Sequence, residues 1–263
     1  KPPSETPLTV MRLAEIIAKE SSLPVGVLNF ITGSGSEVGD ALVRNDVVKL
    51  VTLTGSTRAG LEVFRAAADH CVAVRLELGG KAPFIVMEDT DIDRAVKAAV
   101  IAKFNNCGQI CTCNERMYIH ESIYEKFVAG LIEKTSELVV GDPLNPDTFI
   151  GPKVNKAEVE KINQLVQKSV EQGGKVLLDM TPEMKPTQNG NWMYPIIIEV
   201  PNNDNILMHD EIFGPVLPVM KVRDFDQALD FANDSEYGLS AYLFTNNAKN
   251  IMRAVNELEF GEV

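Results

Sequence analysis

Three of the chain's four cysteines lie within seven positions of each other, in the stretch NNCGQICTCNER at residues 105–116. Cys107, Cys111 and Cys113 can serve as metal ligands, as a redox pair, as buried packing residues or, for one of them, as a nucleophile. Their spacing, C-x3-C-x-C, contains no C-x2-C zinc knuckle, and the three histidines of the chain form no ligand pair. We therefore expect no metal at this cluster.

The residues around Cys111 favour a nucleophile. Gly108 and Gln109 lie just ahead of it and predict a turn whose backbone amides are exposed. Amides that face a thiolate lower the pKa of the thiol, and the same N–H groups can hold the oxyanion that forms when the thiolate adds to a carbonyl. The alternative, a small buried hydrophobe, suits Cys107 and Cys71.

Glu77, in the stretch RLELGG, is a candidate general base. It ends an apolar strand that we predict over residues 72–78, at the carboxyl edge of a sheet. A carboxylate that faces a crevice there would have a raised pKa and could accept a proton from a thiol or a water. A surface glutamate at a strand end remains the alternative at this point.

Two glycine-containing turns each follow a predicted strand and precede a predicted helix, at residues 32–39 and 53–60. The first contains Gly33 in a G-x-G-x-x-x-G pattern, which is one residue longer than the Rossmann fingerprint. The second offers Gly55 and the hydroxyl of Ser56 at a helix start. Backbone amides at helix starts bind phosphate, and open α/β sheets bind nucleotides at their carboxyl edge. The turns indicate a dinucleotide site, with ligand-free βα turns as the alternative.

The loop DEIFGPV at residues 210–216 combines an acidic residue, an aromatic residue and a Gly-Pro pair before a strand. The carboxylate of Glu211 can bind ribose hydroxyls, and the ring of Phe213 can pack on a flat ligand ring. An ordinary turn is the alternative.

Alternating periods of hydrophobicity predict the elements that position these residues. The predicted strands cover residues 25–32, 47–54, 72–78, 82–88, 116–121, 175–180, 194–200, 216–222 and 240–245. The predicted helices cover residues 6–20, with Thr6 as its cap, 36–45, 57–70, 91–106, 122–139, 153–172, 225–234 and 247–258. Strands that alternate with helices predict an α/β fold with a parallel, doubly wound sheet. Gly79 and Gly80 mark the predicted break between the regions 1–78 and 79–263.

Composition excludes several classes of protein. The formal net charge is −12, with 37 acidic and 25 basic residues and no cluster of Lys and Arg, so we expect no nucleic-acid partner. No apolar run reaches the roughly 18 to 20 residues that a spanning helix needs, so we expect a cytoplasmic protein without a membrane contact. The four cysteines are too sparse for a disulfide scaffold. Both ends lack terminal features, which suggests a fragment of a longer chain.

Five motifs occur together in the order and approximate spacing found in the aldehyde dehydrogenase superfamily, which the sequence therefore resembles over essentially its whole length. They are LPVGVLNFITGSGSEVG, LTGSTRAG, LELGGK, GQIC and EIFGPV. Family chains are nearly twice as long, so this sequence resembles their middle. The resemblance implies that residues 1–78 are the later part of a Rossmann-like cofactor domain and that residues 79–263 are most of an α/β catalytic domain.

The resemblance also implies catalytic roles. Cys111, the last residue of GQIC, would add to an aldehyde as a thiohemiacetal, and oxidation by a nicotinamide cofactor would leave a thioester. Glu77 would activate the water that hydrolyses this thioester. The backbone N–H of Cys111 would form part of the oxyanion hole. Cys113 matches a variable position and would be a packing residue.

Cofactor contacts follow from the same resemblance. Gly55 and Ser56 would lie against the pyrophosphate, and the backbone of Leu78 would hold the carboxamide. Glu211 and Phe213 would frame the nicotinamide ribose and ring.

Lys1 and Ser4 predict which cofactor is preferred. By the resemblance, Lys1 would reach the adenosine ribose, and many NAD-dependent members carry a glutamate three residues after that lysine. Ser4 stands there in this sequence, which removes a charge that would repel a 2′-phosphate. We therefore expect NADP in preference to NAD.

The resemblance leaves the substrate and some rival functions open. GQICTCNERMYI is similar to the lactaldehyde, glyceraldehyde and succinate-semialdehyde dehydrogenase branches, and we favour a small hydroxyaldehyde such as lactaldehyde or glyceraldehyde. Rival functions are a coenzyme A-acylating dehydrogenase, which typically lacks the glutamate at position 77, and a non-enzymatic structural relative. The family also implies a homodimer or homotetramer.

Overall fold

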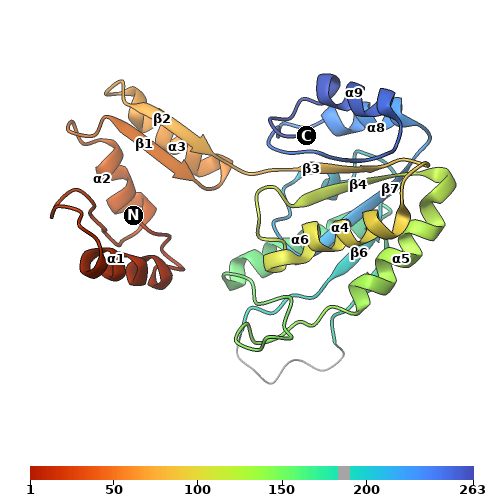
Figure 1. The fold of residues 1–263 in the computed structure, drawn as a ribbon, viewed down its shortest axis with the longest axis horizontal. Coiled ribbons are helices and arrows are strands. Elements are labelled where there is room, and N and C mark those ends of the chain that lie inside the picture. Colours follow the sequence, from red (N-terminus) through yellow and green to blue (C-terminus); the bar gives the residue numbers. More distant parts are fainter. Residues whose placement is uncertain (183–189) are drawn as a thin grey trace. The chain divides into compact units, whose positions relative to one another are not determined.

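A computed structural model of the chain describes residues 1–182 and 190–263. The chain divides into two compact units, Lys1–Gly79 and Gly80–Val263. In Figure 1 the first unit is coloured red to orange and the second is coloured yellow to blue.

The first unit is built on two parallel strands. Its elements are α1 (Leu8–Glu20), the π-helical turn η1 (Gly35–Gly39), α2 (Asp40–Val43), β1 (Leu50–Thr54), α3 (Thr57–Ala68) and β2 (Ala73–Glu77). β1 and β2 pair with Thr54 opposite Glu77, so both strands end at the same level. The buried apolar residues of this unit form a small cluster of Val43, Ala66 and Ala67.

Three expectations for the first unit are wrong. Cys71, expected as a small buried hydrophobe, is exposed in the turn between α3 and β2. Residues 25–32 form no strand: a strand needs a hydrogen-bonded neighbour, and here the amide of Val27 instead donates to Pro24 O in a turn, with Gly26 at φ +90°. Thr6 does not cap α1, because Pro7 is the residue directly before the helix and no side chain caps it.

The second unit contains a six-stranded sheet. Its strands are β3 (Ala82–Val86), β4 (Asn114–His120), β5 (Lys175–Asp179), β6 (Ile196–Glu199), β7 (Val216–Val222) and β8 (Tyr242–Phe244). The strand order is β5-β6-β7-β4-β3-β8. All neighbouring pairs are parallel except β5 with β6 at the edge, which is antiparallel.

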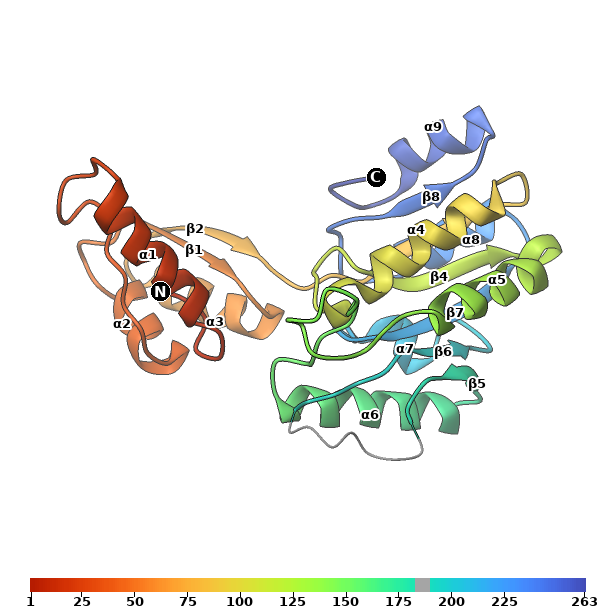
Figure 2. The same cartoon turned by 60° about the horizontal axis from the view of Figure 1, so that its bottom comes forward.

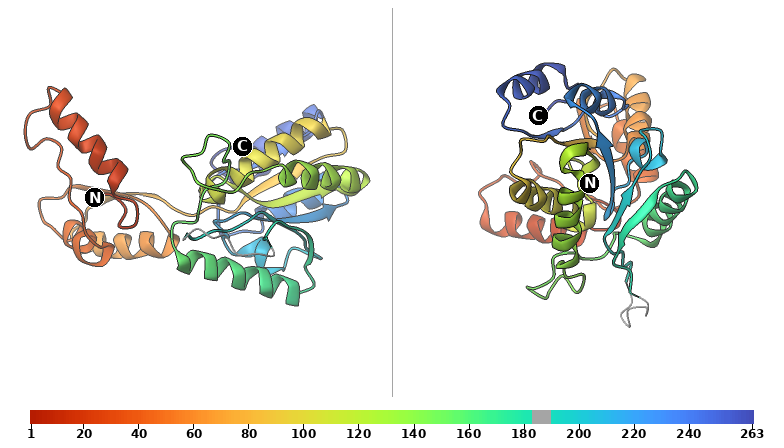
Figure 3. Two further views of the ribbon diagram at one scale, coloured as in Figure 1. Left: turned by 90° about the horizontal axis from the view of Figure 1, so that it is seen from below. Right: turned by 90° about the vertical axis from the view of Figure 1, so that its right-hand side faces the viewer.

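Helices cover both faces of this sheet. They are α4 (Ile92–Phe104), α5 (Tyr124–Ser136), α6 (Lys156–Glu171), α7 (Ile206–His209), α8 (Phe225–Asn233) and α9 (Ala248–Glu257). In the right-hand view of Figure 3, α4 and α5 lie on one face and α6 lies on the other. β5 and β6 lie next to α6 in Figure 2. The central strands are buried on both sides, as expected for a parallel sheet that helices cover.

The α/β fold with a mostly parallel sheet is confirmed. Apart from residues 25–32, each predicted strand and helix corresponds to an element of the structure, and β7 has the bounds 216–222 that the pattern predicts. α7 was not predicted, because four residues are too few to show a helical period. Within the described part of the chain, no helix combines the length and the apolar character needed to cross a membrane.

Candidate active site

The candidate residues of the first unit lie at the carboxyl edge of β1 and β2. The amide of Gly55 donates to the carbonyl of Glu77 at 3.0 Å. Ser56 caps α3, and its Oγ accepts from the amide of Ala59 at 3.3 Å. The turn after β1 and the end of β2 therefore meet, and the carboxylate of Glu77 is exposed beside them.

Four further predicted cofactor residues belong to the same unit. Ser4 Oγ donates to the carbonyl of Gly33 at 3.2 Å, which joins the start of the chain to the first glycine-containing turn. The exposed Lys1 donates to the neighbouring carbonyl of Pro2 at 2.9 Å. Leu78 is half-buried directly after β2.

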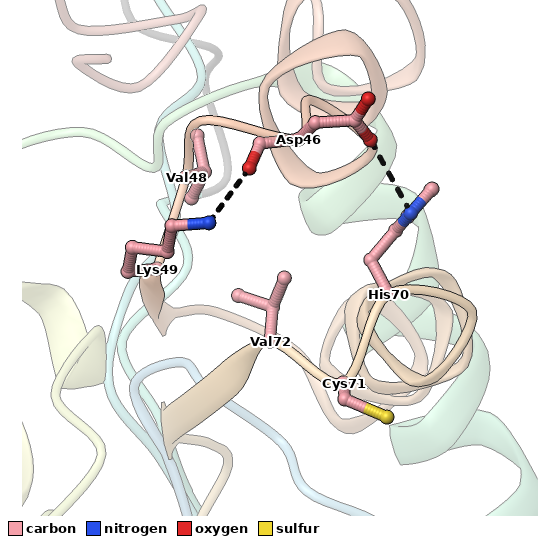
Figure 4. Close-up of a pocket in the computed structure, with 6 residues that line it drawn as sticks. All are labelled: Asp46, Val48, Lys49, His70, Cys71 and Val72. Atoms are coloured by element: carbon pink, nitrogen blue, oxygen red, sulfur yellow. Dashed lines mark hydrogen bonds and ion pairs between the residues drawn. The ribbon is translucent and has the colours of Figure 1, made fainter.

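A pocket in the first unit lies at the opposite end of the two strands and contains none of the predicted site residues (Figure 4). Its lining residues directly precede β1 or β2, or join α2 and α3 to those strands. They are Asp46, Val48, Lys49, His70, Cys71 and Val72. Asp46 links the two sides, because its carbonyl accepts from Lys49 at 2.9 Å and its carboxylate lies 3.5 Å from His70 Nδ1.

In the second unit, the structure separates the three clustered cysteines. Cys107 is fully buried and Cys113 is 2% exposed, whereas Cys111 is partly exposed. Burial raises the pKa of both buried thiols to about 11, and nearby lysines offset this only in part. Cys111 is therefore the accessible thiol of the cluster.

The backbone amide of Cys111 is available as a donor. The neighbouring amides of Gln109 and Cys113 donate to Asn106 O at 3.1 Å and to Ile110 O at 3.0 Å. Within residues 1–182 and 190–263, no protein acceptor takes the N–H of Cys111. A free N–H beside the sulfur has the chemistry of an oxyanion-hole donor.

Two glycines allow the segments around Cys111 to approach closely. A Cβ added to Gly80 would lie 2.0 Å from the carbonyl oxygen of Cys111. A Cβ added to Gly108, which has φ +69°, would lie 2.3 Å from the carbonyl oxygen of Gly214. Both obstacles are backbone atoms that cannot move aside. Glycine is therefore required at both positions for the segments before β3, β4 and β7 to meet.

Glu211 and Phe213 lie in the same assembly of segments. The amide of Gly80 donates to Glu211 Oε1 at 2.8 Å. Burial raises the pKa of Glu211, and the hydrogen bond from Gly80 partly opposes this. Phe213 has φ +54°, a left-handed conformation that is unfavourable for a residue with a Cβ. The ammonium of Lys153 lies 5.4 Å from the Phe213 ring centroid and donates to the Phe213 carbonyl.

A buried group of three charged residues was not predicted. Glu115 lies between Lys81, at 3.1 Å, and Lys103, at 2.9 Å, and all three are at most 2% exposed. Two signals in the sequence point to them. Lys81 follows the glycine pair of LELGGK, and Glu115 with Arg116 directly precedes the apolar run Met117–Ile119 of β4.

The site residues of the second unit gather at the amino ends of three adjacent parallel strands. Gly80 precedes β3, Cys111 precedes β4, and Glu211 with Phe213 precedes β7. The structure thus brings a thiol, a free amide and a partly buried carboxylate to one edge. Glu77 belongs to the other unit, and its action on a thioester at Cys111 remains a prediction.

Comparison with known proteins gives the family. The sequence profile described as "Aldehyde dehydrogenase family" matches residues 1–263. A 3,6-anhydro-alpha-L-galactose dehydrogenase of Vibrio sp. (strain EJY3) is 44% identical over 100% of this chain and 55% of its own length. A D-glyceraldehyde dehydrogenase (NADP(+)) of Picrophilus torridus is 43% identical over 100% of this chain and 53% of its own.

A solved structure of a family member has a similar fold. The crystal structure of lactaldehyde dehydrogenase from Escherichia coli is similar with a TM-score of 0.92 and 39% identity, over 98% of this chain and 53% of that one. The chain belongs to the aldehyde dehydrogenase family, as the sequence motifs indicate. It spans about half the length of the curated relatives it matches.

Proposed function

We propose that the complete protein that contains this chain oxidises an aldehyde to a carboxylic acid with a nicotinamide cofactor, and that Cys111 is its nucleophile. The observation that carries this proposal is the difference between Cys111 and its neighbours. Cys111 is the partly exposed thiol in a turn with a free amide, whereas Cys107 and Cys113 are buried with pKa values of about 11.

The reaction follows from these groups. The Cys111 thiolate forms a bond to the aldehyde carbon, and the carbonyl oxygen becomes an oxyanion that the Cys111 N–H can stabilise. When bound, the nicotinamide cofactor supplies an acceptor for the hydride that leaves this carbon. The remaining thioester takes up water, with Glu77 accepting a proton from it. The C–S bond then breaks, which releases the acid and restores the thiol.

The residues of the second unit suit one end of such a cofactor. Glu211 Oε1 accepts from Gly80, and no hydrogen bond from the described residues reaches Oε2. This oxygen is therefore available to a ribose hydroxyl. The Phe213 ring is partly exposed beside it and can pack against a flat ring.

The first unit suits the other end. Gly55 and the cap residue Ser56 directly precede α3, a helix of 12 residues whose N-terminus favours a phosphate. We propose a preference for NADP, because Lys1 and Ser4 are both exposed and no carboxylate stands at position 4. The NADP(+) named for the Picrophilus torridus relative supports this choice.

For the substrate we propose a small hydroxyaldehyde such as lactaldehyde or glyceraldehyde. Three similar proteins bear the names of dehydrogenases of D-glyceraldehyde, lactaldehyde and 3,6-anhydrogalactose, and all three aldehydes carry hydroxyl groups. Succinate semialdehyde is the alternative, and its carboxylate would require a cationic partner in the aldehyde pocket.

The test compares the wild-type complete protein with the Cys111→Ala and Cys113→Ala variants on lactaldehyde, glyceraldehyde and succinate semialdehyde. We expect Cys111→Ala to lose aldehyde oxidation by a factor of about 10³ or more, because no nucleophile remains. Cys113→Ala should retain it. Unchanged turnover in Cys111→Ala would disprove the assignment. Formation of a coenzyme A thioester in place of the free acid would favour the acylating rival.

A further inference from the structure

One buried carboxylate, from β4, binds backbone amides of the loop Asp210–Gly214, which carries Glu211 and Phe213. Glu115 in β4 accepts from the amide of Ile212 at 2.8 Å and from the amide of Phe213 at 3.3 Å. Glu115 is 2% exposed. Both of its oxygens are therefore directed at the backbone that lies between the two proposed cofactor-binding side chains.

Two buried lysines keep this carboxylate ionised. Lys81 Nζ lies 3.1 Å from Oε2 of Glu115 and Lys103 Nζ lies 2.9 Å from Oε1. Burial acts to raise the pKa of Glu115, but the two ammonium groups outweigh it, so the pKa is lowered. A charged acceptor makes stronger hydrogen bonds to backbone amides than a neutral one.

Lysines also bind the carbonyls of the same loop. Lys81 donates to Asp210 O at 2.6 Å, and Lys161 on α6 donates to Glu211 O at 3.0 Å. Lys153, just before α6, donates to Phe213 O. Charged side chains from β4, from α6 and from the segments before β3 and α6 thus hold amides and carbonyls along the whole loop.

The loop needs such support because its conformation is unfavourable by itself. Phe213 has a left-handed φ of +54°, which a residue with a Cβ adopts only when its surroundings determine it. Glu115 bonds the amide of Phe213 itself and Lys153 bonds its carbonyl. Release of the Glu115 bonds would allow Phe213 to return to an ordinary conformation.

We propose that Glu115, paired with Lys81 and Lys103, is a positioning residue that fixes the loop Asp210–Gly214, so that Glu211 and Phe213 are preorganised for the nicotinamide riboside. This inference rests on the proposed function. It assigns to the cluster a role in cofactor affinity that is separate from general stability. A buried ion pair is often no more stabilising than apolar residues of the same volume, whereas apolar residues could not bond the loop amides.

The test uses the complete protein with two variants. Glu115→Gln leaves two buried lysines without a counter-charge and is expected to lower the melting temperature. In the double variant Lys103→Met/Glu115→Gln, one positive and one negative charge are removed together, so the net charge of the cluster is that of the wild type. The double variant is therefore expected to fold while it lacks the carboxylate.

For the double variant we expect the dissociation constant of NADP, measured by calorimetry without aldehyde, to rise by about tenfold, with a similar rise in the KM for NADP. The KM for the aldehyde and the rate of Cys111 alkylation by iodoacetamide should stay within about twofold of the wild type, because Glu115 bonds neither to the aldehyde nor to Cys111. Glu115→Asp, which keeps the charge, should recover part of the NADP affinity. Glu125→Gln, an exposed partner of Lys221, is the matched control and should match the wild type.

A folded double variant with wild-type NADP affinity would overturn the positioning role. The positioning role would also be overturned if the loss of NADP affinity came with an equal loss of Cys111 reactivity and an equal rise in the KM for the aldehyde. That result would indicate a general structural effect. Failure of the proposed function is distinguishable, since the wild-type protein itself would then oxidise no aldehyde.

Discussion

The two units present their candidate residues at opposite ends of parallel strands. In the first unit, Gly55 and Glu77 lie at the carboxyl ends of β1 and β2. In the second unit, Cys111 and Glu211 lie in the segments that precede β4 and β7, at the amino ends. The general rule that open α/β sheets bind ligands at carboxyl ends therefore describes the first unit only.

The surroundings of the candidate residues also differ between the two units. The first unit offers backbone amides and a helix start on a two-stranded sheet with a small core cluster. The second unit offers side-chain chemistry, supported by a buried triad of Lys81, Lys103 and Glu115 and by close backbone contacts at Gly80 and Gly108. Phosphate recognition needs only an exposed turn with free amides, whereas nucleophilic chemistry needs groups that a rigid core holds in place.

The largest expected difference is in the reactivity of the three clustered cysteines. At pH 8 a thiol with a pKa of about 11 is only about 0.1% thiolate, so Cys107 and Cys113 should resist iodoacetamide while Cys111 reacts. Reactivity of the buried pair should rise only as the pH approaches 11. Peptide mass spectrometry after timed labelling measures this. Labelling of Cys107 as fast as Cys111 would remove the distinction on which the nucleophile rests.

The close contact at Gly80 predicts the next largest effect. Gly80→Ala would force a Cβ to within 2.0 Å of the Cys111 carbonyl and displace the turn. A displacement of about 1 Å at a reacting group can cost about 10²-fold in rate, so kcat/KM should fall by about that factor. Gly130→Ala is the control, because its added Cβ meets Val96 at an ordinary 3.5 Å. Equal activity of both variants would contradict the proposed packing at the amino ends.

The preference for NADP over NAD tests the role that we propose for the first unit. Ser4→Glu introduces a carboxylate beside Gly33, where we place the adenosine ribose. Repulsion of a 2′-phosphate should raise the KM for NADP by about tenfold and leave that for NAD nearly unchanged. Initial-rate kinetics with both cofactors give the ratio. A wild-type protein that already prefers NAD would contradict the choice of NADP.

The smallest expected effect is at the cap of α3. Ser56→Ala removes the Oγ that accepts from Ala59, which should lower the free energy of unfolding by about 1 kcal/mol. The KM for the cofactor should rise only a few-fold, because the backbone amides remain. Ser136→Ala, whose hydroxyl donates back to Ile132 O within α5, serves as the control in the thermal melt. A change in cofactor KM as large as that of Ser4→Glu would show that the hydroxyl itself is the main contact.

The hydrophobic pattern of the sequence predicted most helices and strands, because each has a clear period or an apolar run, as in the strand at 216–222. It failed at residues 25–32, where apolar composition suggested a strand but no neighbour provides hydrogen bonds within the described residues. The motifs pointed to Cys111, Glu211 and Phe213 as candidate residues, and the structure places them in segments that precede the adjacent strands β4 and β7. The Lys81–Glu115–Lys103 cluster was missed because it joins residues up to 34 positions apart, and single-sequence patterns do not report such pairings.

In the proposed mechanism Cys111 carries the acyl group, and water activated by Glu77 then releases it as the acid. This mechanism is tested most directly by intact-mass and peptide mass spectrometry of the complete Glu77→Gln variant, mixed with glyceraldehyde and NADP. With deacylation slowed, we expect one acyl adduct per chain, on the peptide that contains Cys111, formed together with one equivalent of NADPH. NADPH formation without any adduct on that peptide, or an adduct on another residue, would contradict the mechanism.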